Sequence, residues 1–264
     1  MILNNILEYK RKEIAALKRR LPLDKMIKEA EKHTKPKRSL LKALSNGQLH
    51  LICELKKASP SEGMLRRQFR PVHLAKEFES AGASAISVLT ESRYFRGNPR
   101  TIKQIRPCTR IPLLRKDFIL DLYQIYETVL LGADAFLIIA TLVSDSKLKK
   151  MLQLAKRLNL EVLVEVHTKE ELVRAIKAGS KIIGFNNRDL KTLQINRSVS
   201  ERLMRLIPKG VVSVIESGIE SRQDILHYQK NGARNFLIGT TLMKSRNITE
   251  KIHELLGYSR SANA

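Results

Sequence analysis

The sequence of 264 residues contains no tryptophan, only two cysteines and few aromatic residues, which make up 5% of the chain. Two cysteines are too few for a disulfide scaffold or a four-ligand zinc site, so we expect Cys53 and Cys108 to be reduced thiols and no metal to be bound. No run of aromatic residues alternates with arginine, so the chain lacks the stacking platform that single-stranded nucleic acid requires. These absences exclude disulfide-stapled and zinc-stabilised proteins, and we expect no nucleic-acid partner.

Long apolar runs are absent as well. The longest nearly apolar segment, residues 135–143, has about half of the roughly 18 residues that a membrane-spanning helix needs. Near the N-terminus, Asn4, Asn5 and Glu8 interrupt the apolar stretch that a signal peptide requires. We therefore expect a cytoplasmic protein with no membrane partner.

Acidic residues are outnumbered by basic ones, with 26 Asp and Glu against 49 Lys and Arg, for a formal net charge of +23. Such a field concentrates anions near the surface, whether nucleic acid, acidic membranes or small anionic substrates. The basic residues are spread over helix-like segments instead of forming one run, which is typical of solvated helix faces. Charge by itself therefore does not select a partner.

Eight short β-branched or leucine-rich runs recur along the chain, with helical patterns between them. Their starts lie 20 to 34 residues apart, which is the length of a strand, a loop and a crossover helix. Eight such units without a GxGxxG turn favour a closed (β/α)8 TIM barrel, of class α/β, over an open doubly wound sheet. The runs are residues 51–55, 85–89, 111–116, 135–140, 161–166, 181–185, 211–216 and 235–239.

The segments between the runs carry helix boundary signals. Pro71 is placed at a first turn and Gly82 at a helix end, while Asp121 and Gly132 are suited to cap a helix between them. Residues 144–159 and 168–179 follow the same pattern. These signals predict the crossover helices of a parallel barrel.

Residues 1–48 precede the first βα unit and form an N-terminal helical extension in this interpretation. They contain two amphipathic stretches, 2–19 and 22–32, followed by the segment PKRSLLKAL. No linker rich in Pro, Gly or Ser divides the chain. We therefore predict that residues 1–264 form a single barrel domain, capped by this extension.

Charged residues end several of the stripes that face the barrel interior. Alternate side chains of a strand point inward, and the chemistry of such barrels lies at the carboxyl ends of the strands. Glu54, Lys56, Lys116, Glu165 and Arg188 all fall at this mouth. Burying them there costs desolvation free energy that pairing or a bound ligand must offset. The pattern favours a catalytic site for an anion, although each charge taken singly also fits a strand end that reaches solvent.

The same alternation predicts the protonation behaviour of the mouth and the position of a cysteine. Neighbouring lysines suppress one another's protonation and burial raises the pKa of a carboxyl, so we expect both types to exchange protons near neutral pH. Cys53 shares the outward face with Leu55, which predicts an inert thiol beneath a helix.

Two glycine-containing turns, ESGI and IGTTLM, follow the seventh and eighth runs. Barrels of this kind often bind phosphate there, through backbone N–H groups and the N-terminus of a short helix. We predict that Ser217, Gly218, Gly239 and Thr240 bind phosphate. Each glycine taken singly also fits an ordinary turn.

Seven ordered motifs resemble those of the indole-3-glycerol phosphate synthase family of tryptophan biosynthesis. They are ELKKASPSEG (54–63), SVLTESRYFRGN (87–98), LLRKDFILDLYQIYE (113–127), LVEVHTKEEL (163–172), GFNNRDLKTLQIN (184–196), IESGI (215–219) and FLIGTTLM (236–243). The resemblance implies a single (β/α)8 barrel with an N-terminal extension. It also implies a small substrate with a carboxylate and a phosphate, carboxyphenylamino-deoxyribulose phosphate, which is closed to an indole with loss of carbon dioxide and water. No cofactor is implied, and we expect a monomer.

The resemblance also implies catalytic roles. Lys116 resembles the general acid that protonates the ketone oxygen, and Lys56 a substrate-binding lysine that serves as acid when hydroxide leaves. Glu165 and Glu54 resemble acid/base carboxylates, and Asn186 an orienting amide. Which lysine and which glutamate act at each proton transfer stays open.

Further residues would bind the substrate. Phe95, Phe118 and Leu190 resemble an apolar slot for decarboxylation, where loss of solvation favours the departure of carbon dioxide. Arg188 and Ser59 resemble anchors for carboxylate or phosphate, although both also fit ordinary loop caps. Glu216 and Ser217 complete the predicted substrate-binding set.

The sequence differs from the family pattern in the basic loop MLRRQFRP (64–71), in Thr240 and in Phe185, which alternation turns outward. That loop follows the first strand and is a candidate lid. Two alternatives stay open. Another phosphate-binding barrel, such as phosphoribosylanthranilate isomerase, would use a Cys and an Asp at strand ends, whereas Cys53 lies mid-strand. A non-catalytic, basic anion-binding barrel is the other.

Overall fold

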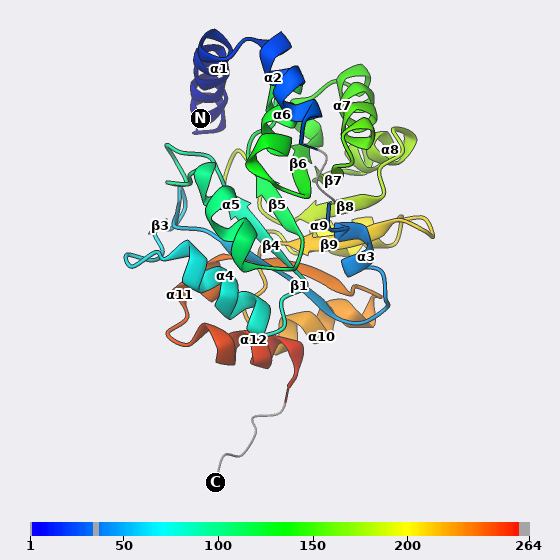
Figure 1. Cartoon of the computed structure of the whole chain (residues 1–264). Helices are drawn as coiled ribbons and strands as arrows, with labels where there is room; N and C mark the ends of the chain where they lie inside the picture. Colours follow the sequence, from blue (N-terminus) through cyan, green and yellow to red (C-terminus); the bar gives the residue numbers. More distant parts are fainter. Residues whose placement is uncertain (1, 34–36, 259–264) are drawn as a thin grey trace.

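The computed structural model describes residues 2–33 and 37–258, and its centre is a closed barrel of eight parallel strands (Figure 1). Around the barrel the order is β1-β10-β9-β8-β7-β6-β5-β4, with β1 also paired to β4. The predicted (β/α)8 barrel is confirmed. The strands are β1 (His50–Leu55), β4 (Ala85–Leu89), β5 (Leu113–Lys116), β6 (Ala135–Ile139), β7 (Glu161–Val166), β8 (Ile182–Asn186), β9 (Val212–Glu216) and β10 (Asn235–Ile238).

Each predicted run contains one strand, with small differences at the ends. The third run starts two residues early, since β5 begins at Leu113 after Pro112, which has no N–H to donate to the ladder. The eighth run ends one residue late, because Gly239 is the N-cap of the next helix. The loop after β1 contains a short antiparallel hairpin, β2 (Ala58–Ser59) and β3 (Gly63–Met64).

Helices surround the barrel, and their ends agree with the predicted signals. Asp121 caps α6 (Leu122–Leu131) in a capping box with Gln124, and Gly132 ends it with a left-handed φ of 84°. The other helices are α4 (Pro71–Ser80), α5 (Arg100–Ile105), α7 (Asp145–Arg157), α8 (Lys169–Lys177), α9 (Ser198–Met204), α10 (Arg222–Lys230), α11 (Thr240–Lys244) and α12 (Ile248–Leu256), with two 3-10 turns, η1 (Arg106–Cys108) and η2 (Ala140–Leu142). In the described residues, none of the helices is long and apolar enough to cross a membrane.

Two hydrophobic cores follow from strand alternation. Ile52 and Leu114 belong to the inner core that fills the barrel, whereas Cys53, Leu55 and Phe185 belong to the outer core between strands and helices. The predicted directions of these side chains are confirmed. Burial raises the pKa of the Cys53 thiol, so the thiolate that would react is disfavoured.

The N-terminal extension forms three helices, α1 (Ile2–Arg20), α2 (Leu23–Glu31) and α3 (Leu40–Ala43), close to the predicted bounds. Residues 34–36, which include the start of PKRSLLKAL, lie outside the described residues, as do residue 1 and residues 259–264. Helix α2 packs beside α6, and α1 lies at the same end of the molecule (Figure 1). At α3, Ser39 Oγ and the Leu41 N–H donate to Glu161 at 2.7 Å each, so α3 is held at the amino end of β7.

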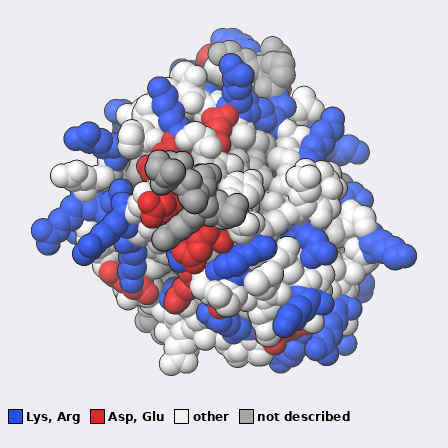
Figure 2. Space-filling model, turned by 90° about the horizontal axis from the view of Figure 1, so that it is seen from below, with Lys and Arg blue, Asp and Glu red and all other residues white. Residues whose placement is uncertain are grey.

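The basic residues do not form one patch on the face that Figure 2 shows. Lys and Arg side chains lie apart over much of this face, while acidic side chains gather near its middle. This distribution agrees with the dispersed charge read from the sequence.

Candidate active site

A cavity of about 590 Å³ opens at the carboxyl ends of the strands. All of the predicted site residues except Glu216 line it. They are Glu54, Lys56, Ser59, Phe95, Lys116, Phe118, Glu165, Asn186, Arg188, Leu190, Ser217, Gly218, Gly239 and Thr240. Residues that are far apart in the sequence are thus brought to one hollow, as strand alternation predicted.

An ionic cluster occupies the floor of the cavity. Lys116 Nζ lies 2.5 Å from Glu216 Oε2 and 3.6 Å from Glu54 Oε1. Glu54 Oε2 lies 3.2 Å from Lys56 Nζ. Glu216 is 1% exposed and lies beneath Lys116 instead of lining the cavity. Its predicted role in binding substrate directly therefore has no support in this geometry, and it is better placed to act through Lys116.

The expectation that the lysines would lose protons readily was wrong for Lys116. Burial alone would lower the pKa of Lys116, but Glu216, Glu54 and Glu165 raise it well above its ordinary value. Lys116 pairs with Glu216 and Glu54, and Lys56 pairs with Glu54, so attraction to carboxylates outweighs the repulsion that sequence reasoning assumed. Lys116 is a fully charged proton donor at neutral pH.

The carboxyls of the cluster divide into two kinds. Burial raises the pKa of Glu216 to about 7, because Glu165 and Glu54 add to the burial and together outweigh Lys116. Burial also opposes ionisation of Glu54, but Lys56 and Lys116 outweigh it and hold its pKa below the ordinary value. The expectation of a raised carboxyl pKa was thus wrong for Glu54, and the raised pKa belongs to Glu216, which that expectation did not include.

Two glycines make room for these carboxylates. A Cβ built on Gly184 would lie 2.1 Å from Glu216 Oε1, and one built on Gly239 would lie 2.3 Å from Glu54 Oε2. Any larger residue would displace a charged group that has buried partners. Sequence reasoning assigned Gly239 to phosphate binding only and gave Gly184 no role of its own, since contacts across the barrel cannot be read from one strand.

The two predicted phosphate turns lie side by side on the cavity wall. Ser217 and Gly218 have left-handed φ values of 67° and 79°, and Gly239 precedes the short helix α11. Ser217 Oγ donates to Asn186 Oδ1 at 2.8 Å, which fixes the amide and the hydroxyl relative to each other. Asn187 Nδ2 donates to the Ser217 carbonyl at 3.0 Å and holds the strained turn in place.

Phe95 and Phe118 form an apolar wall, with ring centroids 6.3 Å apart. Leu190 lines the same cavity, as do Leu3 and Ile6 of α1. The contribution of α1 was missed, because its apolar stripe looked like ordinary helix packing.

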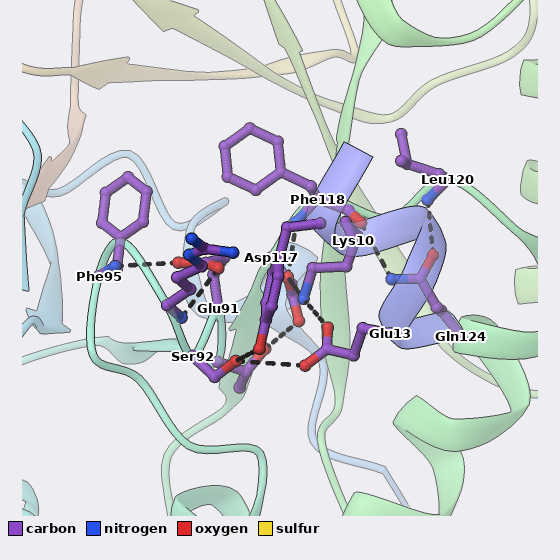
Figure 3. Close-up of polar contacts among 12 residues, drawn as sticks. Lys10, Glu13, Glu91, Ser92, Phe95, Asp117, Phe118, Leu120 and Gln124 are labelled. Carbon is purple, nitrogen blue, oxygen red and sulfur yellow. Dashed lines mark hydrogen bonds and ion pairs between the residues drawn. The ribbon is translucent and has the colours of Figure 1, made fainter. Parts of the chain in front are cut away.

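The loops that carry these two rings are held by buried carboxylates (Figure 3). Glu91 accepts the N–H groups of Arg93, Tyr94 and Phe95 at 2.7–3.0 Å. These hydrogen bonds fix the part of the loop after β4 that carries the Phe95 ring.

Lys10 of α1 joins the N-terminal extension to the loop after β5 that carries the Phe118 ring (Figure 3). Its Nζ lies 2.8 Å from Asp117 Oδ1, which also accepts the Phe118 N–H at 2.8 Å. Both side chains are almost fully buried. This pair was missed as well, since a lysine in an amphipathic helix normally points to solvent.

The loop after β1, predicted as a lid, is attached to α11. Glu62 Oε2 lies 2.6 Å from Lys244 Nζ, and Arg66 Nη1 donates to the Ser245 carbonyl at 3.2 Å. Within the basic segment 64–71, Arg66 is therefore engaged in a hydrogen bond inside the protein. Arg188 donates to the Leu193 carbonyl at 2.7 Å and still lines the cavity.

Metal binding has no support in the described part of the chain, where no group of three or more His, Cys, Asp or Glu side chains is arranged to hold an ion. The chemistry of the site is that of ammonium, carboxyl and amide groups on a closed parallel barrel. Ionised residues at the carboxyl ends of the strands and glycine turns after the last two strands define a (β/α)8-barrel enzyme.

Comparisons with known proteins identify the family. Residues 3–255 match the family model described as indole-3-glycerol phosphate synthase. Proteins of that name from Campylobacter hominis and Acetivibrio thermocellus are 42% and 46% identical, over 97% and 80% of this chain and 100% and 81% of theirs. This chain belongs to the indole-3-glycerol phosphate synthase family.

Solved structures share the fold at low sequence identity. The 3-hexulose-6-phosphate synthase of Salmonella typhimurium superposes with a TM-score of 0.64 at 15% identity, over 79% of this chain and 97% of that one. KGPDC from Streptococcus mutans gives 0.62 at 14% identity, over 79% and 96%. These likenesses support the barrel alone.

Proposed function

We propose that this chain converts 1-(2-carboxyphenylamino)-1-deoxyribulose 5-phosphate to indole-3-glycerol phosphate, carbon dioxide and water, the decarboxylating lyase reaction for which its family is named. One observation carries the proposal: a charged, buried Lys116 stands in a cavity between an apolar wall and two glycine turns. Ring closure needs a proton donor, decarboxylation needs an apolar slot, and the substrate needs a phosphate site. The lining of the cavity has groups suited to all three.

Lys116 acts as the general acid of ring closure. The aromatic carbon that bears the carboxylate attacks the ketone carbon, and the ketone oxygen takes up the Lys116 proton as it becomes a hydroxyl. Glu216, 2.5 Å from Nζ and with a pKa of about 7, is suited to return a proton to the amine. The raised pKa of Lys116 keeps the donor charged until the substrate oxygen develops negative charge.

The apolar wall assists the loss of carbon dioxide. The substrate carboxylate then lies on the carbon that attacked, and its departure sends an electron pair into the adjacent iminium. Phe95, Phe118 and Leu190 exclude water there, so the carboxylate gives up solvation that neutral carbon dioxide does not need. Arg188 and Ser59 anchor the anionic groups of the substrate at the rim.

Dehydration completes the indole. Lys56 donates a proton to the departing hydroxide, and a carboxylate removes the proton from the ring carbon next to nitrogen. Of the carboxylates that line the cavity, Glu165 and Glu54 are the two predicted to act as acid/base groups, and Glu54 is already engaged by both lysines. Glu165 is therefore our choice for the base. Asn186 orients the substrate, supported by its hydrogen bond from Ser217.

Phosphate binds at the adjoining turns of Ser217, Gly218, Gly239 and Thr240. Left-handed backbone at the first two residues directs N–H groups away from the strand ladder, and Gly239 precedes a helix. The isomerase alternative is disfavoured, because the Cys53 side chain lies in the outer core and not in the cavity.

A fluorescence assay tests the proposal directly. The absence of tryptophan leaves a low background, so indole formation from synthetic substrate can be followed in the purified protein. We expect turnover in the wild type and its loss in Lys116→Ala. A folded wild-type protein that forms no indole product, yet binds the substrate, would instead support the non-catalytic anion-binding barrel. The monomeric state and the cytoplasmic location stay predictions, the first of which sedimentation of the purified protein would test.

A further inference from the structure

His167 lies directly after β7, between two carboxylates. Its Nε2 is 3.4 Å from Glu165 Oε1, and its Nδ1 is 3.5 Å from Glu171 Oε2 of α8. The imidazole is 15% exposed and Glu165 is 2% exposed. The ring therefore connects the cavity carboxylate to a second carboxylate just behind it.

Polar atoms without partners meet at this point. In the described part of the chain, both ring nitrogens of His167 and Glu165 Oε1 are buried and make no hydrogen bond. A proton on Nε2 faces the unpaired Glu165 oxygen, so a small rotation of the ring would satisfy both atoms. Glu171 is held in place by the His167 backbone N–H at 2.7 Å and by the Thr141 hydroxyl.

The charges around the ring favour imidazolium. Burial alone would lower the pKa of His167, but Glu171 and Glu165, with Glu216 of β9 further away, raise it above its ordinary value. Asp189, in the loop after β8, is also affected by the His167 charge. These acidic groups favour the protonated ring, while Lys116, whose charge also interacts with Glu165, is a cation of the mouth that opposes it.

Glu165 differs from the other two carboxylates of the mouth in its counter-ion. Glu54 has Lys56 and Lys116, and Glu216 has Lys116 at 2.5 Å. Among the described residues, no Lys or Arg nitrogen lies within 4.0 Å of Glu165, whose ion-pair partner is His167. Unlike a lysine, this partner loses its charge within the range of pH in which enzymes are assayed.

We propose that His167 is a positioning residue for Glu165: its imidazolium pairs with that carboxylate and holds it oriented toward the cavity, where it accepts a proton from the substrate. The inference rests on the proposed function in one respect, the assignment of Glu165 as the base of dehydration. His167 itself does not reach the cavity wall and takes no covalent part. Glu171 in turn keeps the ring facing Glu165, as a second carboxylate orients a catalytic histidine elsewhere.

The pH profile of kcat tests the role. His167→Gln removes the charge and keeps a polar side chain, so the ion pair that orients Glu165 is lost in the range of pH where the wild-type ring is charged. We expect about a tenfold lower kcat than wild type at pH 6 and a difference of less than twofold at pH 9, where the wild-type ring is neutral as well. A loss that is the same at every pH would show a merely structural role and overturn the proposal.

His227→Gln is the matched control. His227 Nε2 lies 2.8 Å from Glu201 on an exposed part of the surface, so its removal takes away a histidine–glutamate pair far less buried than that of His167. We expect an unchanged profile in this variant. If His167→Gln fails to fold, His167→Asn provides the same neutral replacement at smaller volume.

A second measurement needs no substrate. The imidazole ¹⁵N shifts of the six histidines can be titrated by NMR, and the His167 signal is assigned by its loss in His167→Gln. In Glu165→Gln we expect the His167 midpoint to fall by about one pH unit, while Glu201→Gln leaves the His167 midpoint unchanged. An unchanged His167 midpoint in Glu165→Gln would overturn the inference even if the wild-type protein forms the indole product. If the His167 midpoint shifts in Glu165→Gln but the wild-type protein forms no indole product, the proposed function is overturned instead.

Discussion

The two ends of the barrel interior are made from alternate residues of the same strands, yet they differ in chemistry. Ile52 and Leu114 fill the base and are fully buried. Two residues further along the same strands, Glu54 and Lys116 line the cavity and pair with each other at 3.6 Å. Burial of apolar groups stabilises the base, whereas burial of ionised groups at the mouth costs desolvation free energy. The comparison teaches that folding rests on one end of the strands and chemistry on the other.

The largest expected effect is at the mouth. Lys116→Ala should lower kcat by at least about 100-fold, because the ketone oxygen loses its proton donor. Unfolding by urea should show a folded protein, since the barrel core is untouched. Lys150→Ala, at an exposed position of α7, is the matched control and should keep wild-type turnover. Near-normal turnover of Lys116→Ala would remove this residue from the mechanism.

The second expected effect is at the base. Leu114→Ala should lower the free energy of unfolding by about 2–5 kcal/mol, since it leaves a cavity in the inner core. The kcat of the folded fraction should change little, because the residue lies below the ionic cluster. Urea titration and turnover on the same sample measure both quantities. A kcat loss as large as that of Lys116→Ala would break the division between base and mouth.

A third prediction concerns the cost of the charged mouth. The native state holds the Glu216 proton more tightly than the unfolded chain, since the pKa rises from 4.5 to about 7. The stability that this bound proton contributes is therefore fully present below pH 4.5 and is lost as pH rises to about 7. Over that range the free energy of unfolding falls by up to about 1.4 kcal/mol per pH unit. Glu216→Gln should lose this slope. Urea unfolding of both proteins at pH 5, 6 and 7 measures it, and parallel curves would contradict the assignment.

The smallest expected effect is on substrate capture. With a net charge of +23, the protein attracts the anionic substrate over several ångströms, and added salt screens this attraction. The value of kcat/KM should fall by up to about tenfold from low to high ionic strength, with kcat nearly constant. A flat kcat/KM over that range would show that the mouth binds its substrate without steering by the surface charge.

Strand periodicity predicted which residues meet but not how they pair. Alternation placed Glu54, Lys116 and Glu165 at one mouth, and helix boundary signals such as Asp121 were confirmed by a capping box. The predicted protonation behaviour of Lys116 was wrong, because periodicity assigns a side chain to a face and does not say which atoms approach it. Which side chains form ion pairs across the barrel depends on how the strands close in three dimensions.

The same limit explains what the sequence did not predict at the edges of the site. Lys10 is a single lysine in a helix rich in them, and only the packing of α1 over the loop after β5 reveals its buried pair with Asp117. Glu216 was predicted to bind the substrate together with Ser217. Its place beneath Lys116 depends on Gly184 of the neighbouring strand.

Gly239 belongs to two subsites at once. Its backbone is part of the turn assigned to phosphate, while the space beside its α-carbon is filled by the Glu54 carboxylate. An added methyl group would thus push on an acid/base residue while it stiffens an anion-binding turn. Affinity for one end of the substrate and reactivity at the other cannot be adjusted independently at this position, which makes it a poor place for evolution or engineering to begin.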